Sequence, residues 1–591
     1  MADGTSRSPS AQDDPSAGAV RDVAGLGDPS PEPGSPGVES FDYVVVGGGS
    51  AGCLVAAALG RAGASVLVCE LGDPAEDHPE TFDADGYKDA FINDRVIWER
   101  FSTRMRGTGG RRVFLGSGRG VGGSAAVNGM VYTRGDREDF DAWPTGWRWD
   151  DVVDDFAAIE RLLGVRPRPH TRFTRAFVAG AEAAGFRRSD DLNDGDLAGV
   201  IGAETMSYEG DRRRNSYVAA LRPAMDEGAP ISLWTRTRVL RVDFDGTRAV
   251  GVTVRQEGGT TAGERRVRAR REVVLAAGAL ETPKLLMLSG VGPAAELGRH
   301  GIPLVADAPE VGAHLHDHPN VVLFFRGKAE VDAHYPQLYG FHRARPESSH
   351  LSPRQSDTCY VAYPARSSFR EAAMRMIPTL LPAFLYGGWS KGLIRGLIRA
   401  LFWLPPVRRF IDRMWGIVVI LGKPVSRGRV TLAGKDPTAP AVLDPAWLDA
   451  PEDVETLERG VALARRIAGS EPLTAFGSRD VLPGPLDGDR LRRWIRHNVI
   501  TTYHYAGTCR MGDDPEASAC DPDLRLRGVE GVRIADASAI PETPVSALNA
   551  PSMLVGYRAG RRIVAELGVA DVATEASPAR DPVASSSSRR G

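Results

Sequence analysis

The segment YVVVGGGSAG, from Tyr43 to Gly52, constrains the fold more than any other part of the chain. Its first four residues predict a buried strand, GGGSAG has the G-x-G-x-x-G spacing, and an alanine-rich helix pattern runs from Cys53 to Ala62. A second short strand, Ser65 to Cys69, ends at Glu70, whose carboxylate can accept hydrogen bonds from a ribose. This order of elements is typical of a dinucleotide site in a doubly wound α/β sheet.

The residues of the glycine turn have distinct roles toward a dinucleotide. Gly47 permits the tight turn, Gly49 lets the backbone approach the pyrophosphate, and Gly52 allows the helix to pack closely on the strand. Ser50 and Ala51 lie at the start of the helix, whose N-terminus favours the negative phosphates. The motif alone does not distinguish FAD from NAD, and a strand–turn–helix that binds nothing has the same pattern.

Length and composition limit the class of protein. The 591 residues exceed one ordinary core and predict two to four domains, and a net charge of -3 gives no case for nucleic acid. The five cysteines form no C-x-x-C pair, which argues against a disulfide framework or a cysteine zinc site and suits a reducing compartment. The chain has no apolar run of about 18 residues and no apolar N-terminal region. We therefore expect neither a transmembrane helix nor a secretory signal.

Patterns along the rest of the chain predict its other regions. Residues 1–40 and 569–591 are rich in small and polar residues, so we expect flexible tails. The glycine-rich stretch 116–135 favours backbone lying against a planar or phosphorylated ligand, with a mobile loop as the alternative. Periodicity predicts a helix from Trp149 to Leu163, a strand over 233–242, a hairpin of 249–255 with 265–276, and a helix from Thr282 to Leu288.

Five segments carry a resemblance to a known family. The first two are GRGVGGSAAVN, from Gly118 to Asn128, and GALETPKLLMLSGVG, from Gly278 to Gly292. The others, in the same order along the chain, are VGAHLHDHP (311–319), YHYAGTCRMG (503–512) and VRIADASAIP (532–541). With them, over about residues 42–564, the chain resembles the glucose–methanol–choline (GMC) family of FAD-dependent oxidoreductases, and in particular its choline dehydrogenase-like members.

This resemblance implies that the dinucleotide is FAD. Val239 would bind adenine through its backbone, residues 122–128 would lie along the flavin, and Asp536 with Ala537 would close over the ribityl–pyrophosphate side. Some relatives attach FAD through a histidine at the place of Val127, so we expect non-covalent FAD. The predicted FAD residues are Gly47, Gly49, Ser50, Ala51, Gly52, Glu70, Gly118, Gly122, Gly123, Ser124, Asn128, Gly129, Met130, Val131, Val239, Asp536 and Ala537.

The resemblance also implies an α/β fold. A doubly wound, Rossmann-like FAD-binding domain would be interleaved with an α+β substrate-binding domain. Between tails at 1–40 and 569–591, we expect the FAD-binding domain to comprise residues 41–155, 216–320 and 501–568, the last of these with the catalytic histidine. The substrate-binding domain would comprise the two intervening segments, 156–215 and 321–500.

His504, in the fourth family-like segment, is the predicted catalytic base. An alcohol hydroxyl is too weak an acid to ionise near neutral pH, so a base must take its proton as hydride leaves for the flavin. Histidine titrates near that pH, although a hydrogen-bonded structural histidine is the alternative. Relatives carry a second catalytic His or Asn near the C-terminus, where this chain has Ala547. Either Asn549, two residues on, serves instead, or the site works with one histidine.

Two other regions suggest further binding. His314, His316 and His318 alternate along an expected strand and would share one face, as metal ligands or, more simply, as a metal-free D-H-P segment; we predict no metal. Between Glu371 and Asp412 there is no acidic residue, and Lys391, Arg395 and Arg399 fall on one face of an apolar, Trp-flanked helix. This pattern predicts either a membrane-surface element over 389–415 or a lid whose apolar face covers the substrate pocket.

These features and the resemblance together predict an FAD-dependent dehydrogenase that oxidises a small alcohol and passes electrons to a quinone or redox carrier. If the helix over 389–415 is a lid, we expect the alcohol to be apolar. We expect it in the cytoplasm, with the inner face of the membrane as a peripheral site, and with no nucleic acid partner. Three alternatives stay open: an oxygen-using oxidase, a non-oxidising flavoprotein (a lyase or a light-driven fatty-acid decarboxylase), and an electron carrier with an inactive site.

Overall fold

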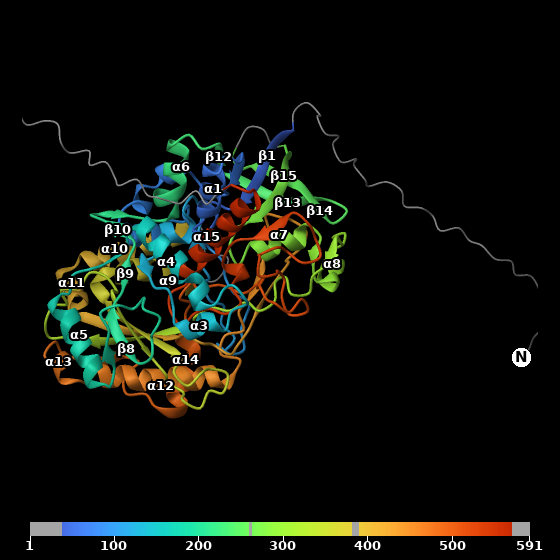
Figure 1. Cartoon of the computed structure of the whole chain (residues 1–591). Coiled ribbons are helices and arrows are strands. Elements are labelled where there is room, and N and C mark those ends of the chain that lie inside the picture. Colours follow the sequence, from blue (N-terminus) through green and yellow to red (C-terminus); the bar gives the residue numbers. More distant parts are fainter. Residues whose placement is uncertain (1–37, 259–262, 381–388, 570–591) are drawn as a thin grey trace, which may run out of the picture. The chain divides into compact units, whose positions relative to one another are not determined.

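The computed structural model describes residues 38–258, 263–380 and 389–569 (Figure 1). The two predicted tails lie almost wholly outside these residues. From Glu39 onward the chain forms one unit, built on two large sheets.

The first sheet is organised around the strand of the glycine motif. Its strands, in order across the sheet, are β12 (Ile231–Trp234), β2 (Val66–Cys69), β1 (Glu39–Val46), β15 (Arg265–Leu275), β14 (Arg248–Gln256) and β13 (Thr237–Asp245), and β25 (Val532–Ile534) also pairs with β15. Neighbouring strands from β12 to β15 pair in parallel, and so do β15 and β25. The other edge is antiparallel: β13 pairs with β14, and β14 pairs with the first residues of β15. The apolar run ending at Val46 is buried because helices cover this sheet.

Close contact between two helices completes this region of the fold. α1 (Gly52–Arg61), which follows the glycine turn, packs on α15 (Asn549–Glu566), the last helix described. A Cβ atom at Gly556 would lie 2.5 Å from Cα of Ala51, so only glycine allows this approach. The C-terminal helix is thereby held at the start of α1, beside the glycine turn.

The expected strand over 233–242 is wrong as a single element. Arg236 has a positive φ of 52° and separates β12 from β13, which lie at opposite edges of the first sheet. The alternation of apolar residues continues through this turn, so periodicity alone did not reveal the break.

The second sheet is largely antiparallel. Its order is β24 (Arg479–Leu482), β18 (Asn320–Arg326), β21 (Met414–Leu421), β20 (Thr358–Pro364), β19 (Leu338–His342), β8 (Val200–Ala203) and β7 (Arg187–Arg188), with only β7 and β8 parallel. Helix α12 (Pro451–Ala468) crosses it so closely that a Cβ atom at Gly460 would lie 2.6 Å from a methyl of Val419. Strands of the two sheets alternate along the chain, which confirms the interleaved α/β fold; the predicted domain limits stay a prediction.

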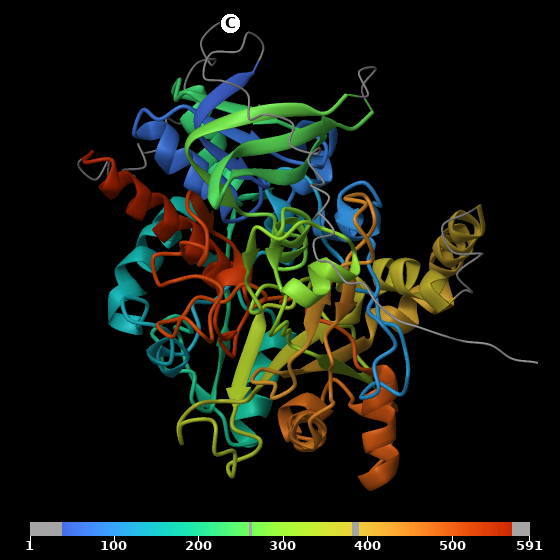
Figure 2. The same cartoon turned by 90° about the vertical axis from the view of Figure 1, so that its right-hand side faces the viewer.

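The remaining helices connect and cover these sheets. They are α2 (Tyr87–Ile92), α3 (Arg137–Asp141), α4 (Trp149–Leu163), α5 (Arg172–Ala183), α6 (Arg222–Asp226), α7 (Thr282–Leu288), α8 (Ala294–Arg299), α9 (Phe369–Met376), α10 (Trp389–Trp403), α11 (Pro405–Asp412), α13 (Glu471–Thr474) and α14 (Gly488–Asn498). The helices predicted at 149–163 and 282–288 are confirmed. In Figure 2, α10 and α11, in gold, project to one side of the sheets.

Candidate active site and cofactor site

The glycine turn after β1 is closed by backbone on one side and open on the other. Gly47 has a φ of 105°, and a Cβ atom there would lie 2.4 Å from the carbonyl oxygen of Ala276. A Cβ atom at Gly52 would lie 2.0 Å from the carbonyl oxygen of Gly47. At Gly49, by contrast, the nearest atom to an added Cβ is Cα of Gly123, at 3.8 Å. Packing against the protein thus does not require glycine at position 49, which suits a place where the backbone approaches a ligand.

Glu70 ties the glycine loops together. Its Oε2 accepts a hydrogen bond from the backbone N–H of Gly48 at 2.9 Å. Its Oε1 accepts from Gly72 at 2.8 Å and from Gly120 at 3.1 Å. A carboxylate has about four acceptor sites, so it can still accept from a ribose. The sequence predicted the ribose role and missed this bracing of two loops.

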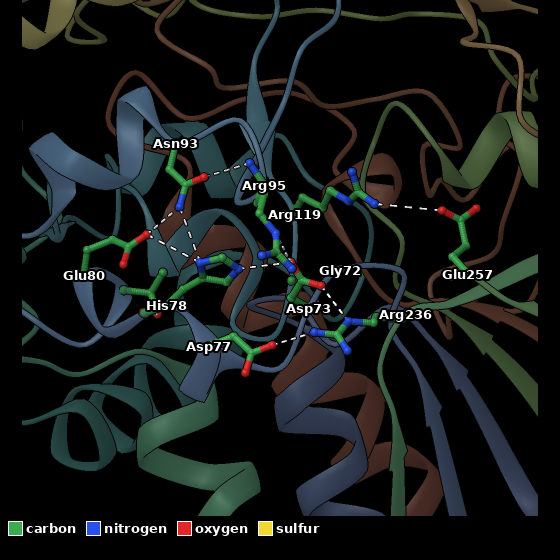
Figure 3. Close-up of polar contacts among 12 residues, drawn as sticks. Gly72, Asp73, Asp77, His78, Glu80, Asn93, Arg95, Arg119, Arg236 and Glu257 are labelled. Carbon is green, nitrogen blue, oxygen red and sulfur yellow. Dashed lines mark hydrogen bonds and ion pairs between the residues drawn. The ribbon is translucent and has the colours of Figure 1, made fainter. Parts of the chain in front are cut away.

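An ionic cluster braces the loop that follows Gly72 (Figure 3). Asp73 pairs with Arg236 at 2.8 Å, Arg95 at 2.9 Å and His78 at 3.1 Å. Burial opposes ionisation of this carboxyl, but the hydrogen bonds from Arg236 and His78 and the charge of Arg95 lower its pKa to about 2. Since Arg236 is the turn between β12 and β13, the cluster fixes that turn beside the cofactor loops.

The predicted flavin loop is held from behind by Arg213, which the sequence did not single out. Nη1 of this buried arginine donates to Oδ1 of Asn128 at 2.8 Å and to the carbonyl of Ala125, and Nη2 donates to the carbonyl of Asn128. Burial lowers the pKa of Arg213 to about 9. Asn128 also caps the strained N–H of Met130, whose φ is 64°. The protein thus uses the side-chain oxygen of Asn128 and the carbonyls of Ala125 and Asn128 to hold the shape of this loop.

Several glycines of these loops leave space for a ligand. A Cβ atom at Gly129 or Gly278 would meet no protein atom within 4 Å. At Gly123, an added Cβ would lie 2.7 Å from Cα of Gly49, so the two loops touch there. Ser124 turns its Oγ to the N–H of Gly118 at 3.1 Å and so closes its own loop.

Asp536 organises the opposite side of the site. One carboxylate oxygen accepts from the N–H of Gly278 at 2.8 Å and from Oγ1 of Thr282 at 2.6 Å. The other accepts from the N–H and the hydroxyl of Ser538. Asp536 therefore joins the turn before α7 to the short helix that begins at Ala537. Among the predicted FAD residues, it acts as an organiser of the backbone.

Val239 lies where β13 is irregular. The pairing of β13 with β14 shifts between Val239 and Arg241, which is a β-bulge. Bulges interrupt the ladder and release backbone groups, and they are common beside binding sites. This feature suits the predicted backbone contact to adenine.

The residues present fit FAD. The glycine backbone is open at Gly49, Gly129 and Gly278, and Glu70 has acceptor capacity to spare. In addition, Nδ2 of Asn549, at the start of α15, is buried without a hydrogen-bond partner among the described residues. A buried amide donor without a partner is costly, so a ligand acceptor is expected beside it.

His504 is held by a cluster of buried polar groups. Its backbone N–H donates to Oδ1 of Asp317 at 2.8 Å, and its Nδ1 lies 2.9 Å from Nδ1 of His318. Oδ2 of Asp317 accepts from Oγ1 of Thr501 at 2.6 Å. Tyr503, directly before the histidine, has a φ of 65°, and backbone strain of this kind is concentrated at functional sites.

Burial dominates the ionisation of this cluster. It lowers the pKa of His504 to about 4, and burial together with the neighbouring His504 lowers the pKa of His318 well below the usual range. It raises the pKa of Asp317 to about 6. Both histidines are therefore neutral near pH 7, but a pKa of about 4 makes His504 a weaker proton acceptor than the ordinary histidine that the sequence predicted.

The second catalytic position contains no polar group. Ala547 is buried in an apolar cluster with Ala84, Met130, Val131 and Met206. Asn549, the predicted substitute, has only the unpartnered Nδ2 described above to suggest a role. Its catalytic role stays a prediction.

The expected histidine strand is wrong. His314 has a φ of 56° and turns the chain, so the three rings do not share a face. His314 binds Glu310 at 2.8 Å, His316 contacts the carbonyl of His314, and His318 contacts His504. Among the described residues, no group of three His, Cys, Asp or Glu side chains is placed to hold a metal ion.

Part of the basic helix face predicted at 389–415 faces the protein, whereas Arg399 is exposed. α10 forms as predicted, but Lys391 and Arg395 turn inward to Asp94 and Glu99, because those carboxylates offer them partners. Leu393, Leu397 and Leu401 point outward, but Ile398 is buried, and the lid stays a prediction. No helix in the described segments of the chain is both long and apolar enough to span a bilayer.

Comparison with known proteins assigns the chain to a family of FAD-dependent enzymes. The sequence pattern of the GMC oxidoreductase family matches residues 41–320 with its N-terminal region and 424–556 with its C-terminal region. An oxygen-dependent choline dehydrogenase of Brucella canis is 32% identical over 552 residues, which is 88% of this chain and 95% of the relative. An uncharacterised GMC-type oxidoreductase of Mycobacterium tuberculosis is 32% identical over 554 residues, 88% of this chain and 98% of that protein.

Solved structures of similar proteins share the fold of this chain. Pyridoxine 4-oxidase from Mesorbium loti superposes with a TM-score of 0.74 at 26% identity, over 88% of this chain and 99% of that one. A formate oxidase has a TM-score of 0.74 at 24% identity, over 90% and 99%, and shows the shared fold.

Proposed function

The chain belongs to the GMC oxidoreductase family, whose members are FAD-dependent enzymes acting on CH–OH groups, and from that premise we propose that it oxidises a small alcohol with His504 as the base. The observation that carries this proposal is the contact of His504 with His318 beside Asp317. It gives the family-like histidine a fixed place and a neutral ring.

The chemistry follows from the two groups that leave the alcohol. Bound FAD would supply the electron acceptor, taking hydride from the carbinol carbon at flavin N5. His504 takes the hydroxyl proton, so that the C–O bond becomes a carbonyl as both hydrogens leave. Without a base the alcohol oxygen would have to carry a positive charge during oxidation, which is why loss of His504 should slow the reaction strongly.

His318 sets which nitrogen of His504 is basic. In a contact between two Nδ1 atoms, one ring must donate and the other accept. Among the described residues, Nε2 of His318 has no hydrogen bond of good geometry, and we assign the carbonyl of Gly422, which favours the protonated ring, as its acceptor. With the proton on Nε2, Nδ1 of His318 accepts from Nδ1–H of His504. Nε2 of His504 then carries the lone pair and acts as the base.

FAD would be held without a covalent bond. The place used for attachment in some relatives is Val127, whose side chain has no nucleophile and packs beside an apolar cluster around Phe114. Gly47, Gly49 and Gly52 would hold the pyrophosphate with the N-terminus of α1, and Glu70 the ribose. Residues 122–131 would line the flavin, supported by Arg213.

For the electron acceptor, we propose a quinone or a redox carrier, which makes the protein a dehydrogenase. We place it in the cytoplasm, at the inner face of the membrane. The five free, buried cysteines support a reducing compartment. The second candidate is an oxidase, because an oxygen-dependent choline dehydrogenase and a pyridoxine 4-oxidase are among the similar proteins.

Anaerobic reduction of the flavin tests this function. The purified protein is mixed in the dark with alcohols ranging from choline to long-chain alkanols, and the flavin band is followed near ~450 nm. Bleaching by one class supports the proposal and identifies the substrate class. Admitting air then separates the candidates, since rapid reoxidation with hydrogen peroxide favours the oxidase and persistence of the reduced state favours the dehydrogenase.

A further inference from the structure

Helix α10 turns Lys391 and Arg395 toward the protein beside the buried Ile398, and it leaves its leucines exposed. Lys391 is 6% exposed, and its Nζ lies 2.6 Å from Glu99 and 2.7 Å from Asp94. Arg395 pairs with Asp94 at 3.0 Å. Surface helices normally show the opposite arrangement. The inward charges, the buried Ile398 and the ring contact of Phe402 with Phe369 hold the helix on the protein while its leucines stay exposed.

We name the exposed apolar residues of α10 and α11 together the outer ridge. Leu393, Leu397 and Leu401 are exposed at intervals of four residues, and Leu397 is 61% exposed. Trp389 and Trp403, at the two ends of α10, are 80% and 78% exposed. The ridge continues through the exposed Leu404 and the exposed Phe410 on α11. Contiguous apolar surface of this kind marks an interaction site.

The segment that carries the outer ridge has charge of one sign. Residues 372–411 contain no Asp or Glu. Arg399, Arg408 and Arg409 are exposed, and within the described chain they make no ion pair or hydrogen bond. Leucine with tryptophan at the ends and unpaired arginine nearby is the composition of helices that lie in the headgroup region of anionic lipid.

The outer ridge rests on a rigid base that reaches the candidate active site. Arg375 is fully buried and binds Asp94 at 2.7 Å and Glu99 at 2.5 Å, the same carboxylates that hold α10. Its guanidinium also lies over the rings of Phe91 and Phe114. Both of these rings contact Tyr503, the neighbour of His504. One layer of side chains therefore separates this base from the catalytic segment.

We propose that the outer ridge docks on the surface of an anionic lipid bilayer. Its leucines and tryptophans enter the boundary between headgroups and acyl chains, and Arg399, Arg408 and Arg409 contact lipid phosphates. The charge complementarity favours lipid over a second copy of this chain, whose own ridge carries the same positive charge and would repel it. Docking brings the substrate domain to the membrane, where an apolar alcohol or a quinone dissolves.

Vesicle flotation of the full-length, FAD-loaded protein tests this inference. Vesicles of phosphatidylglycerol and phosphatidylcholine in equal amounts are compared with vesicles of phosphatidylcholine alone. We expect the protein to float with the anionic vesicles and at least tenfold less with the neutral ones. Leu393→Gln with Leu397→Gln should reduce flotation at least tenfold, and Arg408→Gln with Arg409→Gln should reduce it on anionic vesicles only.

The controls separate this surface from the reaction. Leu304 is 53% exposed and lies outside the ridge, so Leu304→Gln should float like the wild type. All variants should keep their FAD and their alcohol-dependent bleaching, so failure to dock is distinct from failure of the proposed function. No flotation of the wild type, or equal flotation of the double leucine variant, would overturn the inference. A wild type that forms a dimer and binds no vesicles would also overturn the inference if the double leucine variant were a monomer, because the ridge would then be an interface between copies of this chain.

Discussion

Nδ1 of His504 lies 2.9 Å from Nδ1 of His318, although 186 residues separate them in the sequence. Because each ring has one donor and one acceptor nitrogen when neutral, this contact couples the two tautomers. The backbone of both residues is fixed by the same carboxylate, Asp317. The proposed base is thus oriented by its neighbours, in the way that a third group holds the ring that moves a proton at other sites.

The first prediction concerns His318. His318→Leu removes the acceptor for Nδ1–H of His504, so kcat should fall about 10- to 100-fold, the range typical for loss of an orienting partner. In His318→Asn the side-chain oxygen can replace Nδ1 as acceptor and should restore much of the rate. Steady-state kinetics with the alcohol found by flavin reduction measure both. Equal rates in the two variants would contradict the tautomer role.

The second prediction concerns pH. His504 is active when neutral, and burial lowers its pKa to about 4. The value of kcat/KM should therefore stay level from neutral pH down to about 5 and fall tenfold per unit below about 4. Asp317, whose pKa burial raises to about 6, is the other group that titrates here. Asp317→Asn should remove any inflection near 6; a remaining loss centred at 6.5 would assign His504 an ordinary pKa.

The same shift has a consequence for stability. In the unfolded chain, His504 has a pKa near 6.5 and binds a proton below that pH. In the folded protein the ring stays neutral until the pH falls to about 4. Unfolding therefore takes up protons in this window, and the contribution of His504, full above 6.5, is lost as pH falls toward 4. Asp317 acts in the opposite direction, because its raised pKa favours the folded state at low pH.

The third prediction separates cofactor binding from folding. A Cβ atom at Gly49 would lie no closer than 3.8 Å to protein, so Gly49→Ala should keep its melting temperature without FAD. It should nevertheless bind FAD at least about tenfold more weakly, because the methyl group would occupy the space for the pyrophosphate. Titration of the FAD-free protein measures this. Gly52→Ala is the contrasting variant, since its Cβ would lie 2.0 Å from an oxygen and must disturb the turn.

The fourth prediction concerns attachment of the cofactor. Because Val127 has no nucleophile, acid precipitation of the holoprotein should release all of the flavin into the supernatant. Absorbance of pellet and supernatant measures the division. Flavin that stays with the precipitated chain would show a covalent bond and exclude our account of this position.

Local signals predicted much of the fold. The helices α4 and α7 follow from apolar spacing and from the glycines that end them, Gly164 and Gly290, and these signals lie within a few residues. The glycine turn was likewise predictable because its conformation leaves no choice of residue. Where a turn used an ordinary residue, as at Arg236, the sequence carried no mark of it.

Partners across the chain could not be predicted in this way. The spacing of Lys391 and Arg395 showed that they share a helix face, but Asp94 and Glu99, nearly 300 residues earlier, decide that this face is buried. Arg213 behind the flavin loop and His318 beside the base are long-range contacts of the same kind. Periodicity gives a side chain its face and leaves open what that face meets.

The rate of flavin reduction in His504→Ala tests the central claim most directly. Wild type and variant, each saturated with FAD, are mixed without oxygen in the dark with the best alcohol in a stopped-flow instrument. We predict that the variant keeps the flavin spectrum and FAD content and is reduced about 10²- to 10⁴-fold more slowly, as expected for loss of a general base. Reduction at a rate near that of the wild type would contradict the role of His504. If no alcohol reduced even the wild type, the lyase and photoenzyme alternatives would replace alcohol oxidation.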